Sequence, residues 1–183
     1  MRKVMLAVFA VCVSAMAAAA QDKANYSGTW TLDKEKSTFS GPMRVDSMTL
    51  TVAQTAKDIK VDTSTKRLPP NDGPAGGGPG RGMGGRGFGM GDGSTTYSLD
   101  GKEIKTEMDG PNGKMPVTHK GKLDADGSLK LTTTRSFTGP MGEMTMTTNE
   151  TWKLSADGKT LTIDRENTTP RGAQTSKLVF TKG

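Results

Sequence analysis

The chain has little of what thiol or metal chemistry requires, since its 183 residues include one cysteine and one histidine. The cysteine, Cys12, lies in an N-terminal segment that we expect to be removed. The remaining chain can therefore form no disulfide, thiolate nucleophile, iron–sulfur cluster or cysteine-ligated zinc site. His119 alone cannot supply the several ligands of a zinc hydrolase. The sequence thus predicts no metal and no cofactor.

Long apolar segments are also scarce. Residues 4–15 form an apolar run that is too short to span a bilayer as a helix. A basic start before this run and four alanines after it, at 17–20, are typical of a signal peptide cleaved after Ala20. The sequence therefore predicts a signal peptide over 1–20, a mature domain over 21–183, and a periplasmic or secreted location.

Aromatic residues make up 5% of the chain, with two tryptophans and two tyrosines. A transmembrane β-barrel needs a girdle of aromatic residues at each membrane interface, which so few cannot build. Removal of the signal peptide takes away Arg2 and Lys3 and lowers the formal charge of +6 by two. We therefore expect no membrane span and only a mildly basic mature domain.

Residues 69–93 contain 12 of the 24 glycines and almost no apolar side chains. Such a segment cannot bury enough surface to offset its ordering entropy, which predicts a flexible loop. Its stretch 80–88 is similar in composition to RNA-binding Arg-Gly-Gly segments, but two arginines and one phenylalanine supply little stacking. We expect a linker and no nucleic-acid partner, with weak contact to an anionic surface or polymer as the alternative.

Outside this loop, apolar and polar residues alternate, which indicates strands with one buried face. The alternating runs are 48–52, 59–61, 97–99, 104–108, 117–119, 129–137, 144–154, 161–163 and 178–180. Asp-Gly or Asn-Gly dipeptides, typical of tight hairpins, separate several of them. The acidic turns at 124–127 and 156–158 lack the terminal glutamate of an EF-hand loop, so we expect hairpins there rather than calcium sites. The pattern predicts an all-β fold, a single antiparallel up-and-down barrel of about 8–10 strands.

The most specific segment is Tyr26-Ser27-Gly28-Thr29-Trp30-Thr31-Leu32-Asp33, followed by Lys36-Ser37-Thr38-Phe39. Together with the unit at 152–162, which begins Trp152-Lys153-Leu154-Ser155, it resembles bacterial secreted lipocalin-like domain proteins. The resemblance covers both ends of the mature chain and most of the middle, but not residues 69–93. It implies a lipocalin-like barrel.

The Gly28-x-Trp30 pair on the first strand also resembles the opening of the lipocalin superfamily. The resemblance implies that Trp30 closes the bottom of the barrel and that Gly28 is structural. It further implies that a late basic side chain packs across the indole ring, for which Arg165 and Lys177 are candidates.

Several polar residues share the apolar phase of their strands and should point inward. Arg135 is in phase with Leu131, and Glu150 is in phase with Trp152. A two-residue hairpin at 156–157 would place Trp152 opposite Leu161 and leave Glu150 diagonal to Arg165. Inward charges must pair or meet a polar ligand, because an unpaired buried charge is costly. The alternative is that these charges reach solvent at the rim of the barrel.

These considerations predict a non-enzymatic lipocalin-like barrel that binds a small hydrophobic or amphipathic molecule. His119 shares the phase of Val117, which favours either a hydrogen-bonded core or rim histidine or a ligand contact, and no Gly-x-Ser-x-Gly elbow accompanies it. The alternative function is a cell-envelope interaction module with a filled barrel. The candidate ligand contacts are Tyr97, His119, Arg135, Glu150, Trp152 and Arg165, and no catalytic residue is expected.

Overall fold

The computed structural model describes residues 24–40, 45–68, 92–110, 113–139 and 142–183. The predicted signal peptide, residues 1–20, and residues 69–91 of the predicted loop lie outside this part of the chain. The last residue assigned to that loop, Gly93, is instead the first residue of a strand.

Ten antiparallel strands form one sheet, which confirms the predicted all-β, up-and-down architecture. The strands are β1 (Gly28–Thr38), β2 (Val45–Gln54), β3 (Asp58–Arg67), β4 (Gly93–Ser98), β5 (Asp100–Gly110), β6 (Gly113–Leu123), β7 (Leu129–Gly139), β8 (Gly142–Leu154), β9 (Thr160–Thr169) and β10 (Gly172–Lys182). Their order across the sheet is β4-β3-β2-β1-β10-β9-β8-β7-β6-β5. The first strand, β1, pairs with the last, β10, so every strand except the outermost two, β4 and β5, has two neighbours.

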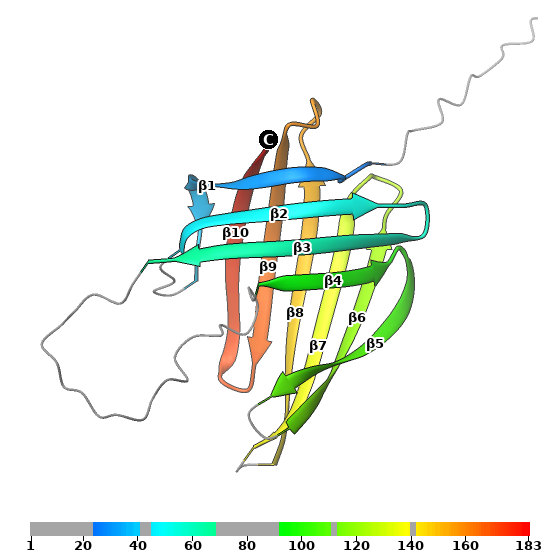
Figure 1. The fold of residues 1–183 in the computed structure, drawn as a ribbon, viewed down its shortest axis with the longest axis vertical. Coiled ribbons are helices and arrows are strands. Elements are labelled where there is room, and N and C mark those ends of the chain that lie inside the picture. Colours follow the sequence, from blue (N-terminus) through cyan, green and yellow to red (C-terminus); the bar gives the residue numbers. More distant parts are fainter. Residues whose placement is uncertain (1–23, 41–44, 69–91, 111–112, 140–141) are drawn as a thin grey trace, which may run out of the picture.

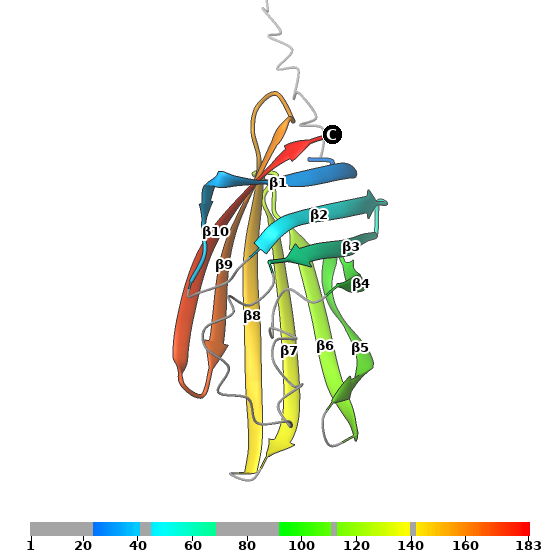
Figure 2. The same ribbon diagram turned by 60° about the vertical axis from the view of Figure 1, so that its left-hand side comes forward.

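The sheet folds over on itself into a nearly closed barrel. In Figures 1 and 2, β2, β3 and β4 run across one end of strands β6 to β9, whose other ends project beyond them. The outermost strands, β4 and β5, meet at Leu99, where the Leu123 N–H donates to the Leu99 carbonyl at 3.4 Å. In the part of the chain described, no helix is long and apolar enough to cross a bilayer.

Two Asp-Gly turns share one local design, as their similar sequences suggest. Gly127 and Gly158 have φ values of 82° and 66°, in the left-handed region that glycine tolerates best. The preceding carboxylates accept backbone N–H groups, Asp126 from Ser128 at 2.9 Å and Asp157 from Lys159 at 3.0 Å. Both segments are therefore hairpin turns, as predicted.

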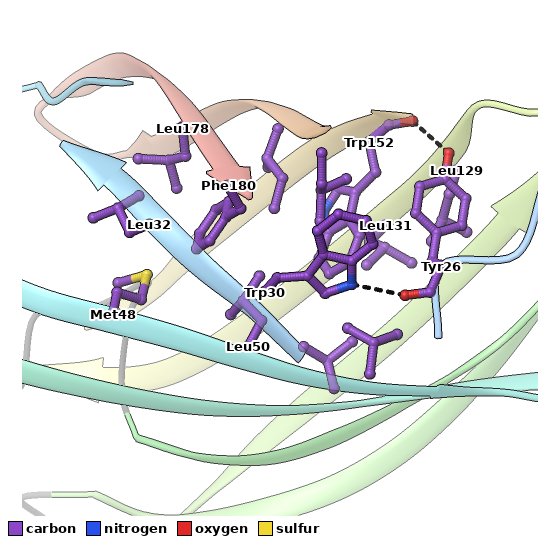
Figure 3. Packing of buried hydrophobic residues seen from close by; sticks show 14 of the residues in the cluster. Tyr26, Trp30, Leu32, Met48, Leu50, Leu129, Leu131, Trp152, Leu178 and Phe180 are labelled. Carbon is purple, nitrogen blue, oxygen red and sulfur yellow. Dashed lines mark hydrogen bonds between the residues drawn. The ribbon is translucent and has the colours of Figure 1, made fainter. Parts of the chain in front are cut away.

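The hydrophobic core occupies the end of the barrel where β1 crosses (Figure 3). Trp30 is fully buried, and its Nε1 donates to the Tyr26 carbonyl at 2.9 Å. The Tyr26 hydroxyl donates to the Trp152 carbonyl at 2.9 Å and also lies 2.8 Å from the Gly127 carbonyl. The segment before β1 is thus tied to two hairpins more than 100 residues away, which closes this end.

The basic side chain over Trp30 is Lys182, not Arg165 or Lys177 as the resemblance implied. Its Nζ lies 5.2 Å from the centre of the indole ring. β10 pairs with β1 so that Lys182 stands opposite Trp30, whereas Lys177 is exposed and Arg165 points into the barrel interior. Gly28 has a φ of 137°, and a Cβ there would lie 2.7 Å from Cε of Lys182, so Gly28 leaves room for the lysine chain.

Candidate functional site

The barrel encloses a cavity of about 440 Å³ beside the core. Its apolar lining comprises Met48, Leu50, Val61, Tyr97, Ile104, Met108, Val117, Leu131, Trp152, Ile163 and Phe180. Its polar lining includes Thr63, His119, Thr133, Arg135, Thr148, Glu150 and Arg165 in the interior and Thr106, which is exposed. All six residues that the sequence analysis proposed as ligand contacts therefore line one cavity, although they come from five strands.

The two sides of the cavity differ in chemistry. β2 and β3 contribute three buried apolar side chains, Met48, Leu50 and Val61, and one uncharged polar side chain, Thr63. On the facing strands β7, β8 and β9, polar side chains of neighbouring strands stand directly opposite one another and form rows across the sheet. One row pairs Glu150 with Arg165, and the next row pairs Thr133 with Thr148. The cavity is therefore amphipathic.

Glu150 bonds to two other residues of the cavity wall, Arg165 and Trp152. Its Oε1 accepts from Nε of Arg165 at 2.6 Å and also contacts Nη2, while its Oε2 accepts from Nε1 of Trp152 at 2.8 Å. The side chains of Glu150 and Arg165 are 10% and 15% exposed, so these charges do not reach solvent at a rim. Both carboxylate oxygens therefore accept hydrogen bonds, and Oε2 fixes the Trp152 indole in the cavity wall.

The pairing of β8 with β9 differs from the two-residue hairpin predicted from sequence. Trp152 stands opposite Ile163 rather than Leu161, and Glu150 stands directly opposite Arg165 rather than diagonal to it. The turn is longer because the Ser155 N–H donates to the Thr160 carbonyl, which closes a four-residue connection at 156–159. A shift by two residues keeps every side chain on its predicted face, so the ion pair forms inside the barrel.

A second set of hydrogen bonds surrounds His119, which is 8% exposed. The Tyr97 hydroxyl lies 3.0 Å from Oγ1 of Thr133, and that oxygen lies 3.4 Å from Nδ1 of His119. The other ring nitrogen, Nε2, lies 3.1 Å from Oγ1 of Thr106. Both ring nitrogens thus face hydroxyl groups, which can donate or accept, and the neutral imidazole is satisfied in either tautomer.

Tyr97 reaches this cluster because β4 approaches β6 very closely. A Cβ at Gly121 of β6 would lie 2.9 Å from Cβ of Tyr97 and 2.8 Å from the Ser98 carbonyl oxygen. The Tyr97 and His119 rings meet edge to face at 5.4 Å. Burial raises the pKa of Tyr97 to about 12, and the charge of Glu150 adds to this rise, so the hydroxyl stays protonated at neutral pH. Gly121 therefore positions a hydrogen-bonding phenol in the cavity.

The environment of His119 predicts a pH dependence of stability. Burial lowers the pKa of His119 below 6.5, and the positive charge of Arg135 lowers it further. The unfolded chain therefore takes up this proton at a higher pH than the folded protein does. The free energy of unfolding should fall as the pH drops below about 6.5 and should stop falling from this source below the folded pKa.

Urea unfolding of the wild type and of His119→Gln at pH 7.5 and pH 5.5 measures this effect. His119 is the only histidine in the chain, so the variant should lose less stability than the wild type between these two pH values. Equal losses in the two proteins would contradict the assignment of the proton to His119.

Arg135 is the one cavity cation for which the described residues provide no ion-pair partner. Its Nε is buried and has no hydrogen-bond partner there. Burial lowers the pKa of the guanidinium, and nearby Arg165 acts in the same direction, whereas Tyr97 and Glu150 oppose it. The structure thus holds a partly buried guanidinium against the cavity, with its Nε unpaired and no ion-pair partner among the described residues.

Sequence reasoning did not identify Thr106, Thr133 or Gly121 as parts of the site. The two threonines share the phase of their apolar neighbours, which was an available signal. No local pattern marks Gly121, because its role depends on the approach of β4 from elsewhere in the chain. Among the residues described, no three His, Cys, Asp or Glu side chains are placed to hold a metal ion.

A second hollow, of about 590 Å³, lies over β8, β9 and β10. Its lining is mostly short polar side chains, such as Thr151, Asp164 and Thr175, and the last two are exposed. None of its lining residues is hydrophobic or aromatic, whereas small-molecule sites are lined mainly by such residues. We therefore place the candidate site in the barrel interior rather than on this outer face.

No protein-family model and no curated protein sequence matches this chain. Among solved structures, it is similar to the zebrafish ileal bile acid-binding protein in complex with cholic acid, with a TM-score of 0.48 and 13% sequence identity. The match covers 86% of this chain and 98% of the zebrafish chain. At this level of similarity, the zebrafish protein's ligand says nothing about the contents of this cavity. The resemblance to bacterial lipocalin-like proteins stays a prediction.

Proposed function

We propose that this chain is an exported, non-enzymatic binding protein that holds a small, partly apolar molecule inside its barrel. The cavity of about 440 Å³ is the observation that carries this proposal. Its volume lies within the range of about 300 to 1,000 Å³ that is typical of small-molecule sites. Its largely apolar side on β2 and β3 faces β7, β8 and β9, which add both apolar side chains and convergent polar groups, and this mixture is the usual composition of such a site.

Two further observations support the proposal over its alternatives. An interaction module with a filled barrel would have side chains in the space that the cavity occupies. A Ser–His–Asp hydrolase built on His119 would need a carboxylate to orient the ring, but the hydrogen-bond partners described for this ring are the hydroxyls of Thr133 and Thr106. Export rests on the signal-peptide pattern of residues 1–20.

Binding of N-phenyl-1-naphthylamine, an uncharged dye that fluoresces in apolar surroundings, tests the proposal. We expect saturable binding of one dye per wild-type protein. Val117→Trp should abolish this binding, because Val117 is 3% exposed and lines the cavity, so the larger ring would occupy the lumen. Thr118→Trp is the matched control, since the neighbouring side chain does not line the cavity.

Circular dichroism melting curves check that both variants fold, since overpacking costs about 1 to 3 kcal/mol. Undiminished dye binding by folded Val117→Trp would place the dye outside the barrel and contradict the proposal. Absence of saturable binding by the wild type would contradict it as well.

A further inference from the structure

The interior of the cavity carries more positive than negative charge. Arg135 and Arg165 supply two cations, and Glu150 supplies one anion that is already bonded to Arg165. His119 adds no charge at neutral pH, because burial lowers its pKa. Two other carboxylates border the cavity, Asp92 and Glu107, but both are exposed and screened by solvent. One unit of positive charge in the interior is left unbalanced.

This excess charge belongs to Arg135. Glu150 is the ion-pair partner of Arg165 and also accepts from Trp152, and its single negative charge cannot balance both arginines. Val117 and Met146, which stand opposite Arg135 on the two neighbouring strands, are apolar and buried. A buried Arg Nε without an acceptor is costly, and protein interiors rarely leave such a group unpaired.

An incoming anion would remove that cost. The guanidinium is planar and offers a fork of N–H groups that matches a carboxylate in two parallel hydrogen bonds. Thr133 precedes Arg135 by two residues on the same strand and the same face, and it brings the hydroxyl cluster with Tyr97 to the cavity. The buried residues Leu50, Val61 and Leu131 supply apolar surface to the same space.

We infer that the cavity binds an amphipathic monocarboxylate, whose head group pairs with Arg135 while its hydrocarbon body lies against β2 and β3. This inference rests on the proposed function and adds the charge and the head-group chemistry of the ligand. It assigns Arg135 as the residue that selects an acid over an uncharged molecule of the same size.

Displacement of N-phenyl-1-naphthylamine by dodecanoate and by dodecan-1-ol at pH 7.5 tests the inference, since the two compounds share one chain and differ in head group. We expect the wild type to bind dodecanoate roughly tenfold or more tightly than dodecan-1-ol, because a charged hydrogen-bonded pair in a partly buried site provides that discrimination. Arg135→Gln should lose about this factor for dodecanoate and much less for dodecan-1-ol, so the ratio of the two affinities should fall toward one. Arg171→Gln, which removes an exposed arginine outside the cavity, should match the wild type for both compounds.

The outcomes separate the inference from the proposed function. Equal affinity of the wild type for acid and alcohol, or failure of dodecanoate to displace a bound dye, overturns the monocarboxylate while the binding cavity stands. Absence of dye binding overturns the proposed function itself. The ligand-free melting temperature of Arg135→Gln gives a further check, because removing an unpaired buried charge should leave it unchanged or raise it. A clear fall would mean that the fold itself uses this charge, and would also overturn the inference.

Discussion

Replacement of Trp30 by alanine is expected to lower the free energy of unfolding by about 3 to 5 kcal/mol, as is typical of fully buried aromatic residues. Trp30 is 0% exposed and lies on β1 between Leu50 of β2 and Lys182 of β10. Its removal leaves a cavity at the closed end and frees the Tyr26 carbonyl, which accepts the indole N–H at 2.9 Å. It also removes the ring beneath Lys182.

Chemical denaturation followed by circular dichroism measures this loss, since the substitution removes one of the two tryptophan fluorophores. Trp30→Phe keeps most of the apolar area but leaves the Tyr26 carbonyl without its partner, so we expect a smaller loss of about 1 to 3 kcal/mol. The adjacent exposed residue provides the control, and Thr31→Ala should change stability by less than about 0.5 kcal/mol. A loss of under about 1 kcal/mol for Trp30→Ala would show that the ring does not hold this end closed.

The alternation of side chains predicted the faces of the strands, and hence the residues that line the interior. Because side chains alternate with a period of two, a shift in strand pairing by an even number of residues leaves every side chain on the same face of the sheet. This is why Glu150, Trp152 and Arg165 were all placed inside although the β8–β9 hairpin is two residues longer than expected. The exact pairing depends on the turn, where Asp157 and Gly158 favour the longer connection by accepting a backbone N–H and by adopting a positive φ.

Contacts between distant strands lay beyond the sequence pattern. Lys182 stands over Trp30 because the first and last strands pair in one register, which no local motif encodes. The volume of the cavity likewise depends on how β2 to β4 cross β6 to β9 (Figures 1 and 2). Alternation identifies which side chains point inward, but not whether they meet across the interior and fill it.

The Glu150–Arg165 pair should be the most sensitive polar contact in the barrel. Glu150→Ala leaves two arginines in the cavity interior with no interior carboxylate, and it also removes the acceptor of the Trp152 indole N–H. Breaking a buried ion pair from one side typically costs about 3 to 5 kcal/mol, because the remaining charge is desolvated and unpaired. We expect a loss of that size in urea unfolding at pH 7.5.

A second substitution separates the charge imbalance from the loss of packing. Glu150→Ala combined with Arg165→Met should recover part of the stability, since no unpaired partner then remains from this ion pair. Glu166→Ala is the matched control, because Glu166 neighbours Arg165 but is exposed, and its loss should cost less than about 1 kcal/mol. If Glu150→Ala lowered the free energy of unfolding no more than Glu166→Ala, the Glu150–Arg165 pair would behave as a solvated surface contact. Water would then reach the interior of the barrel more than the burial of these side chains indicates. The strong dependence of binding on Arg135 would then be lost as well, because water would screen that charge too.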